Sequence, residues 1–105
     1  TLLTATTEGA AQTIGTVRED SLGIVEGFFV ANQTGSPVSL TVNFVPDGGV
    51  LGAANREIPA LTVPGNTNVD LRDLIAGLYA PGTIVQAFAS TGSALIVGGY
   101  VRGLL

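Results

Sequence analysis

The stretch VSLTVNFVPDGG, residues 38–49, decides the fold class of this chain. Between residues 38 and 45, apolar side chains take every second position: Val38, Leu40, Val42 and Phe44. Side chains of an extended strand alternate between its two faces, so this pattern predicts an antiparallel strand with one buried face. The Pro-Asp-Gly-Gly sequence at 46–49 predicts a tight turn directly after it.

Short strands of the same kind are predicted on both sides of this stretch, with turn residues between them: 11–18, 22–31, 57–63, 67–71, 83–90 and 94–102. Pro59 cannot donate to a strand ladder, so 57–63 is expected at a sheet edge. The last two strands are expected to form a hairpin across 91–93. The spacing of strands and turns predicts an all-β, antiparallel β-sandwich of jelly-roll type, with about seven or eight strands and at most one helical turn.

The length of 105 residues fits one domain. We expect residues 10–105 to form a single β-sandwich domain. Residues 1–9 are rich in Thr and lack a clear period, but carry the apolar Leu2 and Leu3. They are therefore expected to form an extended N-terminal arm that contacts another subunit.

The composition excludes most kinds of active site. The chain has four Arg and eight acidic residues, a net charge of −4, and no Lys, His, Cys, Met or Trp. The commonest general base, thiol nucleophile and transition-metal ligands are thus missing. Four scattered Arg cannot form a nucleic-acid site, and no apolar run approaches the roughly 20 residues that span a bilayer. We expect no enzyme, no cofactor, no metal, no nucleic acid and no membrane contact.

The polar motifs are interpreted as structural. Asp70 and Asp73 fit a helical turn over 70–75 with Asp70 as its N-cap better than an acid–base pair. Asn32-Gln33-Thr34 matches a glycosylation sequon, but a turn is the preferred interpretation. Glu19-Asp20 is interpreted as a solvated turn.

Strands 83–90 and 94–102 are apolar on both faces. If Val85, Ala87 and Ala89 face the core, Ile84 and Phe88 face outward; if Leu95, Val97 and Val101 face inward, Ile96 and Tyr100 face outward. Only 11% of the residues carry charge, which also suggests a surface covered by a partner. The predicted interface comprises these outward residues and both apolar ends of the chain: Thr1, Leu2, Leu3, Ile84, Phe88, Ile96, Tyr100, Leu104 and Leu105.

The run GFFVANQTGSPVSLTVNFVPDGGVLGAANREIPALTVPGNTNVDL, followed by APGTIVQAFAS, resembles a family of small virion proteins of tailed bacteriophages. The resemblance lies in turn elements in a fixed order, such as Val-Pro-x-Gly-Gly at 45–49 and Gly-x-Ala-Asn at 52–55. It covers about two-thirds of the chain and leaves out residues 1–20 and 101–105. The stretch 70–78 is longer than in that family.

The resemblance implies a non-catalytic structural protein of the virion surface, made in the host cytoplasm. A capsid decoration (cement) protein that stabilises the phage head is the first expectation. Its partners would be the major capsid protein and copies of itself, as a trimer, because decoration proteins often occupy local three-fold axes. A neck, tail or fibre-base component is the alternative. A carbohydrate- or receptor-binding sandwich is a third, although only Tyr79 and Tyr100, and no Trp, are available as binding-site rings beside the four Phe.

Overall fold

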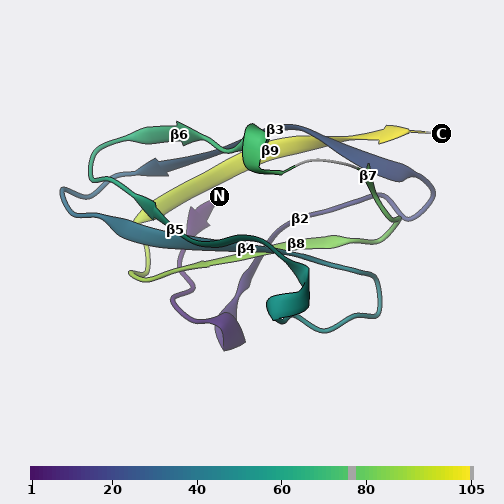
Figure 1. The fold of residues 1–105 in the computed structure, drawn as a ribbon, viewed down its shortest axis with the longest axis horizontal. Coiled ribbons are helices and arrows are strands. Elements are labelled where there is room, and N and C mark those ends of the chain that lie inside the picture. Colours follow the sequence, from purple (N-terminus) through teal and green to yellow (C-terminus); the bar gives the residue numbers. More distant parts are fainter. Residues whose placement is uncertain (76–77, 105) are drawn as a thin grey trace.

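The computed structural model describes residues 1–75 and 78–104. Two antiparallel sheets pack face to face (Figure 1). The five-stranded sheet contains β1 (Leu2–Leu3), β9 (Leu95–Leu104), β3 (Leu22–Asn32), β6 (Asn68–Asp70) and, beside β3, β7 (Leu78–Tyr79). The four-stranded sheet contains β2 (Gln12–Thr16), β8 (Ile84–Ala89), β4 (Val38–Val45) and β5 (Arg56–Val63). Three short 3-10 turns complete the described part: η1 (Glu8–Ala10), η2 (Ala53–Asn55) and η3 (Arg72–Leu74).

The strand order confirms the predicted sandwich and is that of a jelly roll. The sheets run β1-β9-β3-β6 and β2-β8-β4-β5, with the short β7 outside this path. Early strands therefore pair with late ones: β1 with β9, β2 with β8, β3 with β6 and β4 with β5. The chain folds back on itself as a whole, as two Greek keys require.

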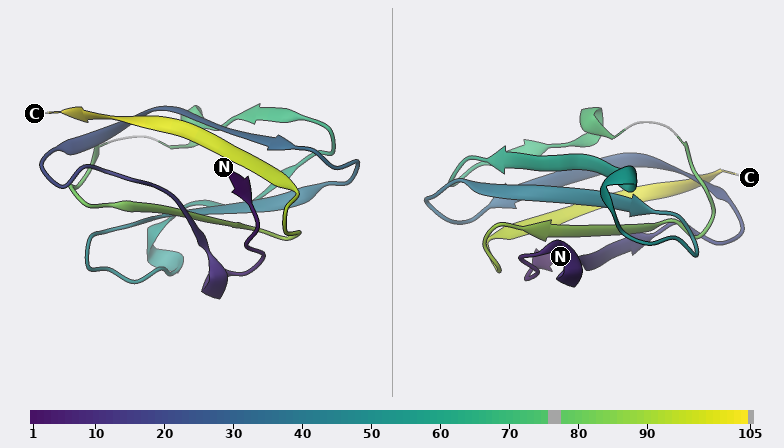
Figure 2. Two further views of the ribbon diagram at one scale, coloured as in Figure 1. Left: turned by 180° about the vertical axis from the view of Figure 1, so that it is seen from behind. Right: turned by 60° about the horizontal axis from the view of Figure 1, so that its bottom comes forward.

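This topology overturns the predicted final hairpin. β8 and β9 follow one another in sequence but lie in opposite sheets, and each pairs with strands distant in sequence. The turn at 91–93 carries the chain from one layer to the other, which Figure 2 shows in both views. The outward side chains of β8 and β9 consequently lie on opposite faces of the molecule.

The core lies between the sheets and follows the alternation of the sequence. Val38, Leu40, Val42 and Phe44 of β4 are buried, as predicted. In β8 the side chains alternate strictly, with Val85, Ala87 and Ala89 buried and the residues between them only partly buried. Pro59 lies in the edge strand β5, as expected.

Residues 1–9 do not form an arm that leaves the domain. Leu2 and Leu3 pair with Ile96 and Leu95 of β9, and the Leu3 side chain is fully buried in the core. The N-terminal ammonium group donates to the Val97 carbonyl oxygen at 2.8 Å. The apolar N-terminus is therefore part of its own sandwich, because Leu3 fills space between the two sheets.

The sequon Asn32-Gln33-Thr34 lies at a turn, in agreement with the interpretation preferred from the sequence. The side-chain amide of Asn32 donates to the Ser36 and Val63 carbonyl oxygens at 2.9 and 3.0 Å. Its Oδ1 accepts from the amide of Thr34 at 2.9 Å. Asn32 is 3% exposed and its side chain ties the end of β3 to the end of β5.

Candidate interaction surface

The residues predicted as an interface are divided among several parts of the structure. Leu2, Ile96 and Tyr100 lie on the outer face of the five-stranded sheet, because the buried residues Leu3, Leu95 and Val97 alternate with them. Ile84 and Phe88 lie on the outer face of the four-stranded sheet, and Leu3 is in the core. Thr1 contacts Val97 of its own chain. Leu104 ends β9, and Leu105 lies outside the described residues.

The predicted patch of Ile84, Phe88, Ile96 and Tyr100 therefore does not exist as one surface. It depended on a β8–β9 hairpin, and the two strands belong to different sheets. The orientation of each strand was nevertheless right, since all four side chains point away from the core. Each outer face must be considered separately.

The outer face of the five-stranded sheet is centred on two aromatic rings placed over glycines. Phe29 pairs across the strands with Gly98, and Tyr100 pairs with Gly27. A Cβ atom on Gly98 would lie 2.7 Å from the Phe29 ring, and one on Gly27 would lie 2.9 Å from the Tyr100 ring. Both rings therefore lie close against the sheet. They remain 46% and 64% exposed, respectively, so an apolar surface faces solvent at the centre of this sheet.

Polar groups surround these rings. A shallow groove between the rings and β6 is bordered by Glu26, Asn68, Asp70 and Arg72. Glu26 also pairs with Arg102 at 3.0 Å on the same face. An aromatic centre with a polar rim is the usual anatomy of a protein-binding surface.

Further exposed apolar residues extend this face along β3. Leu22 and Leu78 are both exposed, and Ile24, the cross-strand partner of Leu78, is partly buried. We call the outer surface formed by Leu2, Leu22, Phe29, Leu78, Ile96 and Tyr100 the apolar face. Sequence reasoning missed Phe29, although the adjacent pair Phe28-Phe29 in a strand requires one of the two rings to point outward.

The outer face of the four-stranded sheet differs, because other parts of the chain cover it. The Asn43 amide donates to the Gly52 carbonyl oxygen at 2.9 Å and to Oδ1 of Asn55 at 2.8 Å. Arg56 pairs with Glu8 of η1 at 2.8 Å. Figure 1 shows η1 and η2 beneath this sheet. Phe88 and Ile84 are only partly exposed there, so this face offers less apolar surface.

The carboxylates serve local structure. Oδ1 of Asp70 accepts from the Arg72 amide at 3.0 Å, but the N-cap of η3 is Leu71 and no side chain caps this turn, so the predicted N-cap role of Asp70 is wrong. Asp20 pairs with Arg18 at 3.0 Å in the exposed turn predicted at 19–20. Within residues 1–75 and 78–104, no three acidic side chains gather as a metal site would require.

The surroundings of Tyr79 change its ionisation. It stacks on Phe44 with ring centroids 4.2 Å apart. Burial, and secondarily the negative charge of Glu57, raises the pKa of Tyr79 to about 12. The phenol therefore stays neutral at physiological pH and acts as a packing group at the end of the sandwich.

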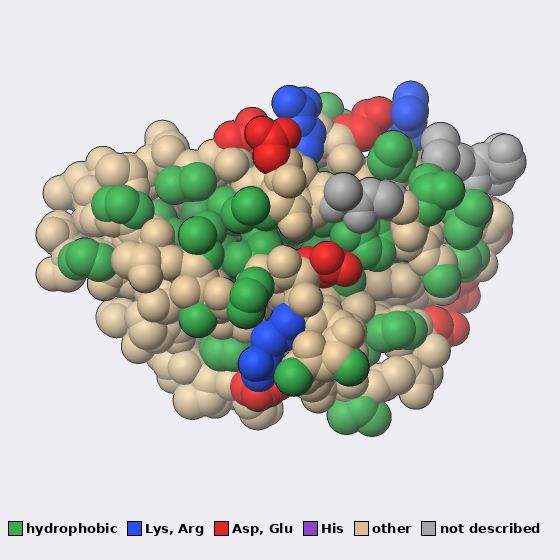
Figure 3. All heavy atoms as spheres, in the orientation of Figure 1, with side chains coloured by type: hydrophobic (Ala, Val, Ile, Leu, Met, Phe, Trp, Pro, Cys, Tyr) green, Lys and Arg blue, Asp and Glu red, His purple; other side chains and the backbone are tan. Residues whose placement is uncertain are grey.

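Charged groups are sparse on the side of the molecule that shows β5 and β6. Figure 3 shows hydrophobic side chains between the two layers, with the Arg, Asp and Glu side chains standing in small separate groups.

None of the helical turns among the described residues has the length or apolar character to cross a membrane. Comparison with known protein families, with curated proteins and with solved structures finds no match for this chain.

Proposed function

We propose that this chain is a structural virion protein, a capsid decoration (cement) protein that binds the head of a tailed phage through the apolar face. The observation that carries the proposal is the pair of exposed rings, Phe29 and Tyr100, held against glycines at the centre of a sheet. The resemblance in the turn elements supplies the virion as the setting.

The physical basis of binding is burial of apolar area. Each Å² of apolar surface removed from water contributes roughly 25 cal/mol, before the losses of association are subtracted. A stable contact buries about 800 Å² per partner. Because the rings are already fixed by the sheet, little conformational entropy is lost when a partner covers them.

The partners in this proposal are the major capsid protein and further copies of the chain. Bound across a boundary between capsid subunits, the apolar face adds contact area where pressure from packaged DNA pulls the shell apart. On the head itself, the resemblance favours copies around a local three-fold axis. This role replaces the expected N-terminal arm, because Leu3 is already buried in its own core.

The proposal is tested by binding of the purified protein to empty heads of the phage that encodes it. Phe29→Glu places a charge at the centre of the apolar face. Thr62→Glu is the matched control, because Thr62 is exposed on β5 in the other sheet. Loss of a central aromatic anchor typically costs 2 kcal/mol or more, so Phe29→Glu should weaken binding by roughly 30-fold or more.

The variants distinguish this function from the alternatives. Equal binding of Phe29→Glu and wild type to heads would refute the apolar face as the contact. Binding of the wild type to isolated tails but not to heads would favour a neck or tail component. Binding to neither, but to host polysaccharide, would favour a receptor-binding module.

A further inference from the structure

The C-terminal half of β9 has an unpaired edge. β1 covers the start of this edge, where the amide of Val97 donates to the Thr1 carbonyl oxygen at 2.9 Å. β1 has only two residues, and Thr1 before it extends the hydrogen bonding no further than Val97. In an antiparallel ladder, alternate residues direct both backbone groups to the same side. Counting from Val97, the backbone groups of Gly99, Val101 and Gly103 face the open edge. Figure 2 (left) shows β1 beside only one end of β9.

The other sheet edges carry features that discourage further pairing. β2 has a register shift between Thr13 and Gly15, and β5 contains Pro59 and two register shifts. β6 has only three residues. Natural proteins use such irregularities, prolines and short strands to prevent edge-to-edge association. The segment 99–103 contains no proline and no residue inserted within β9, because the bulge in the β3–β9 ladder, between Val25 and Gly27, lies on β3; Gly99 has a φ of +159°.

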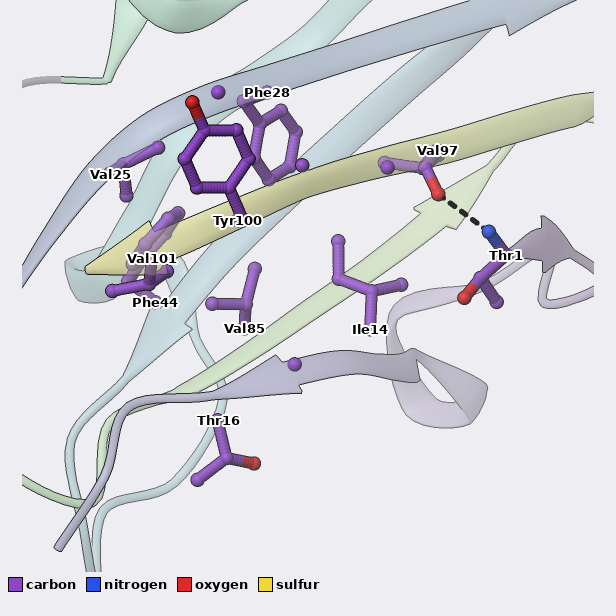
Figure 4. A pocket seen from close by; sticks show the side chains of 14 residues that line it. Thr1, Ile14, Thr16, Val25, Phe28, Phe44, Val85, Val97, Tyr100 and Val101 are labelled. Carbon is purple, nitrogen blue, oxygen red and sulfur yellow. Dashed lines mark hydrogen bonds between the residues drawn. The ribbon is translucent and has the colours of Figure 1, made fainter. Parts of the chain in front are cut away.

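A cavity lined by apolar side chains and by polar strand backbone lies beneath the open edge. It is about 280 Å³ in volume and opens between β9 of one sheet and β2 of the other. Ile14, Val85 and Val101 line it from three strands, with Phe44 behind them (Figure 4). We call the open side of the space between the two sheets the seam. Leu3 of β1 closes the neighbouring part of this seam, whereas nothing among the described residues closes the part below Val101.

We propose that segment 99–103 pairs with the same segment of a second copy, antiparallel and around a two-fold axis at Val101. Val101 then faces Val101 of the second copy, and Gly99 faces its Gly103. The three pairs that face each other across the edge exchange about six backbone hydrogen bonds. The added strand also places apolar side chains over the open seam.

The side chains of this segment favour a second copy as the occupant. In the two-fold register, Tyr100 faces Arg102 of the other copy, and the reverse contact is equivalent. Tyr100 is exposed and Arg102 is held on the same face by Glu26, so each guanidinium can lie near a ring. Shifting the axis by one residue to 102 would place two Arg102 side chains directly opposite, which is unfavourable. The inference concerns the sheet edge and shares only Tyr100 with the residues that define the apolar face.

A single cysteine tests the register directly, because the chain contains no other Cys. Residues facing each other in a hydrogen-bonded pair have Cα atoms about 5.5 Å apart, which a disulfide can bridge. Val101→Cys should therefore form a disulfide-linked dimer at high dilution under mild oxidation. Thr62→Cys, on the edge strand β5, should remain largely unlinked. Equal cross-linking of the two variants, or none in either, would overturn the proposal.

The mass in solution provides a second readout without cross-linking. In sedimentation equilibrium the wild type should shift to twice the mass of one chain as its concentration rises. Val101→Ala keeps the outward amide and should still dimerise. Val101→Pro removes that amide and should be monomeric, with circular dichroism matching the wild type. A wild type that stays monomeric throughout, or a folded Val101→Pro that dimerises as well as Val101→Ala, would refute edge pairing.

Discussion

Replacing Leu3 by Ala distinguishes two roles for the N-terminus: a strand that packs in the core of its own domain, and an arm that binds a partner. Leu3 is fully buried although it is only the third residue, and its neighbour Leu2 is 45% exposed on the outer face. Leu-to-Ala changes at buried sites cost about 2–5 kcal/mol of unfolding free energy. Leu3 lies in a two-residue strand near an open seam, where neighbours can partly relax, so about 3 kcal/mol is expected.

Thermal unfolding of the isolated protein measures this effect. For a domain near this size, about 3 kcal/mol corresponds to a fall in Tm of roughly 10–15 °C. Leu2→Ala, which removes the same atoms one residue earlier, should change the unfolding free energy by less than about 1 kcal/mol. If the two variants had equally small effects on Tm, and Leu3→Ala weakened only particle binding, the N-terminus would be an arm and the placement of β1 would be wrong.

Three further predictions concern the alkaline limit, a buried amide and a glycine. Burial raises the pKa of Tyr79 to about 12, above its ordinary value of 10.0 in the unfolded chain. The contribution of the neutral phenol to the unfolding free energy is complete below pH 10 and is lost as the pH rises toward 12. Tyr79→Phe should therefore reduce the fall of the urea unfolding midpoint between pH 10 and pH 12. An unchanged fall would contradict this prediction. Asn32→Ala leaves the buried Val63 carbonyl oxygen without its side-chain donor, and denaturant unfolding should show a loss of about 2 kcal/mol, against the near-zero loss expected of a surface turn. Gly99→Ala would force a Cβ into a backbone carbonyl oxygen of β3 and should abolish soluble folded protein, whereas Gly52→Ala meets no atom and should express and melt like the wild type.

Local patterns in the sequence predicted local structure well. β4 has the predicted bounds, and the inward and outward residues of β8 are those that the alternation indicates. These features depend on the two-residue period of a single strand, which burial between two sheets enforces. β1 and β7 have two residues each, too few to show any period, and were not predicted as strands.

Pairing between strands was beyond the reach of these patterns. A short turn such as 91–93 can join neighbours in one sheet or carry the chain to the opposite sheet, and the residues are compatible with both. The jelly roll takes the second course, because β9 pairs with β3 and β1. The candidate surface changed accordingly: Ile96 and Tyr100 stayed together, but their neighbour proved to be Phe29 rather than Phe88.

The copy number of this chain in purified phage particles tests the central claim most directly. Quantitative mass spectrometry of intact particles gives its molar ratio to the major capsid protein. A decoration protein bound across the head through the apolar face should be present in numbers comparable with the major capsid protein. Absence from the particles, or only the few copies of a single neck or tail ring, would contradict the proposed role.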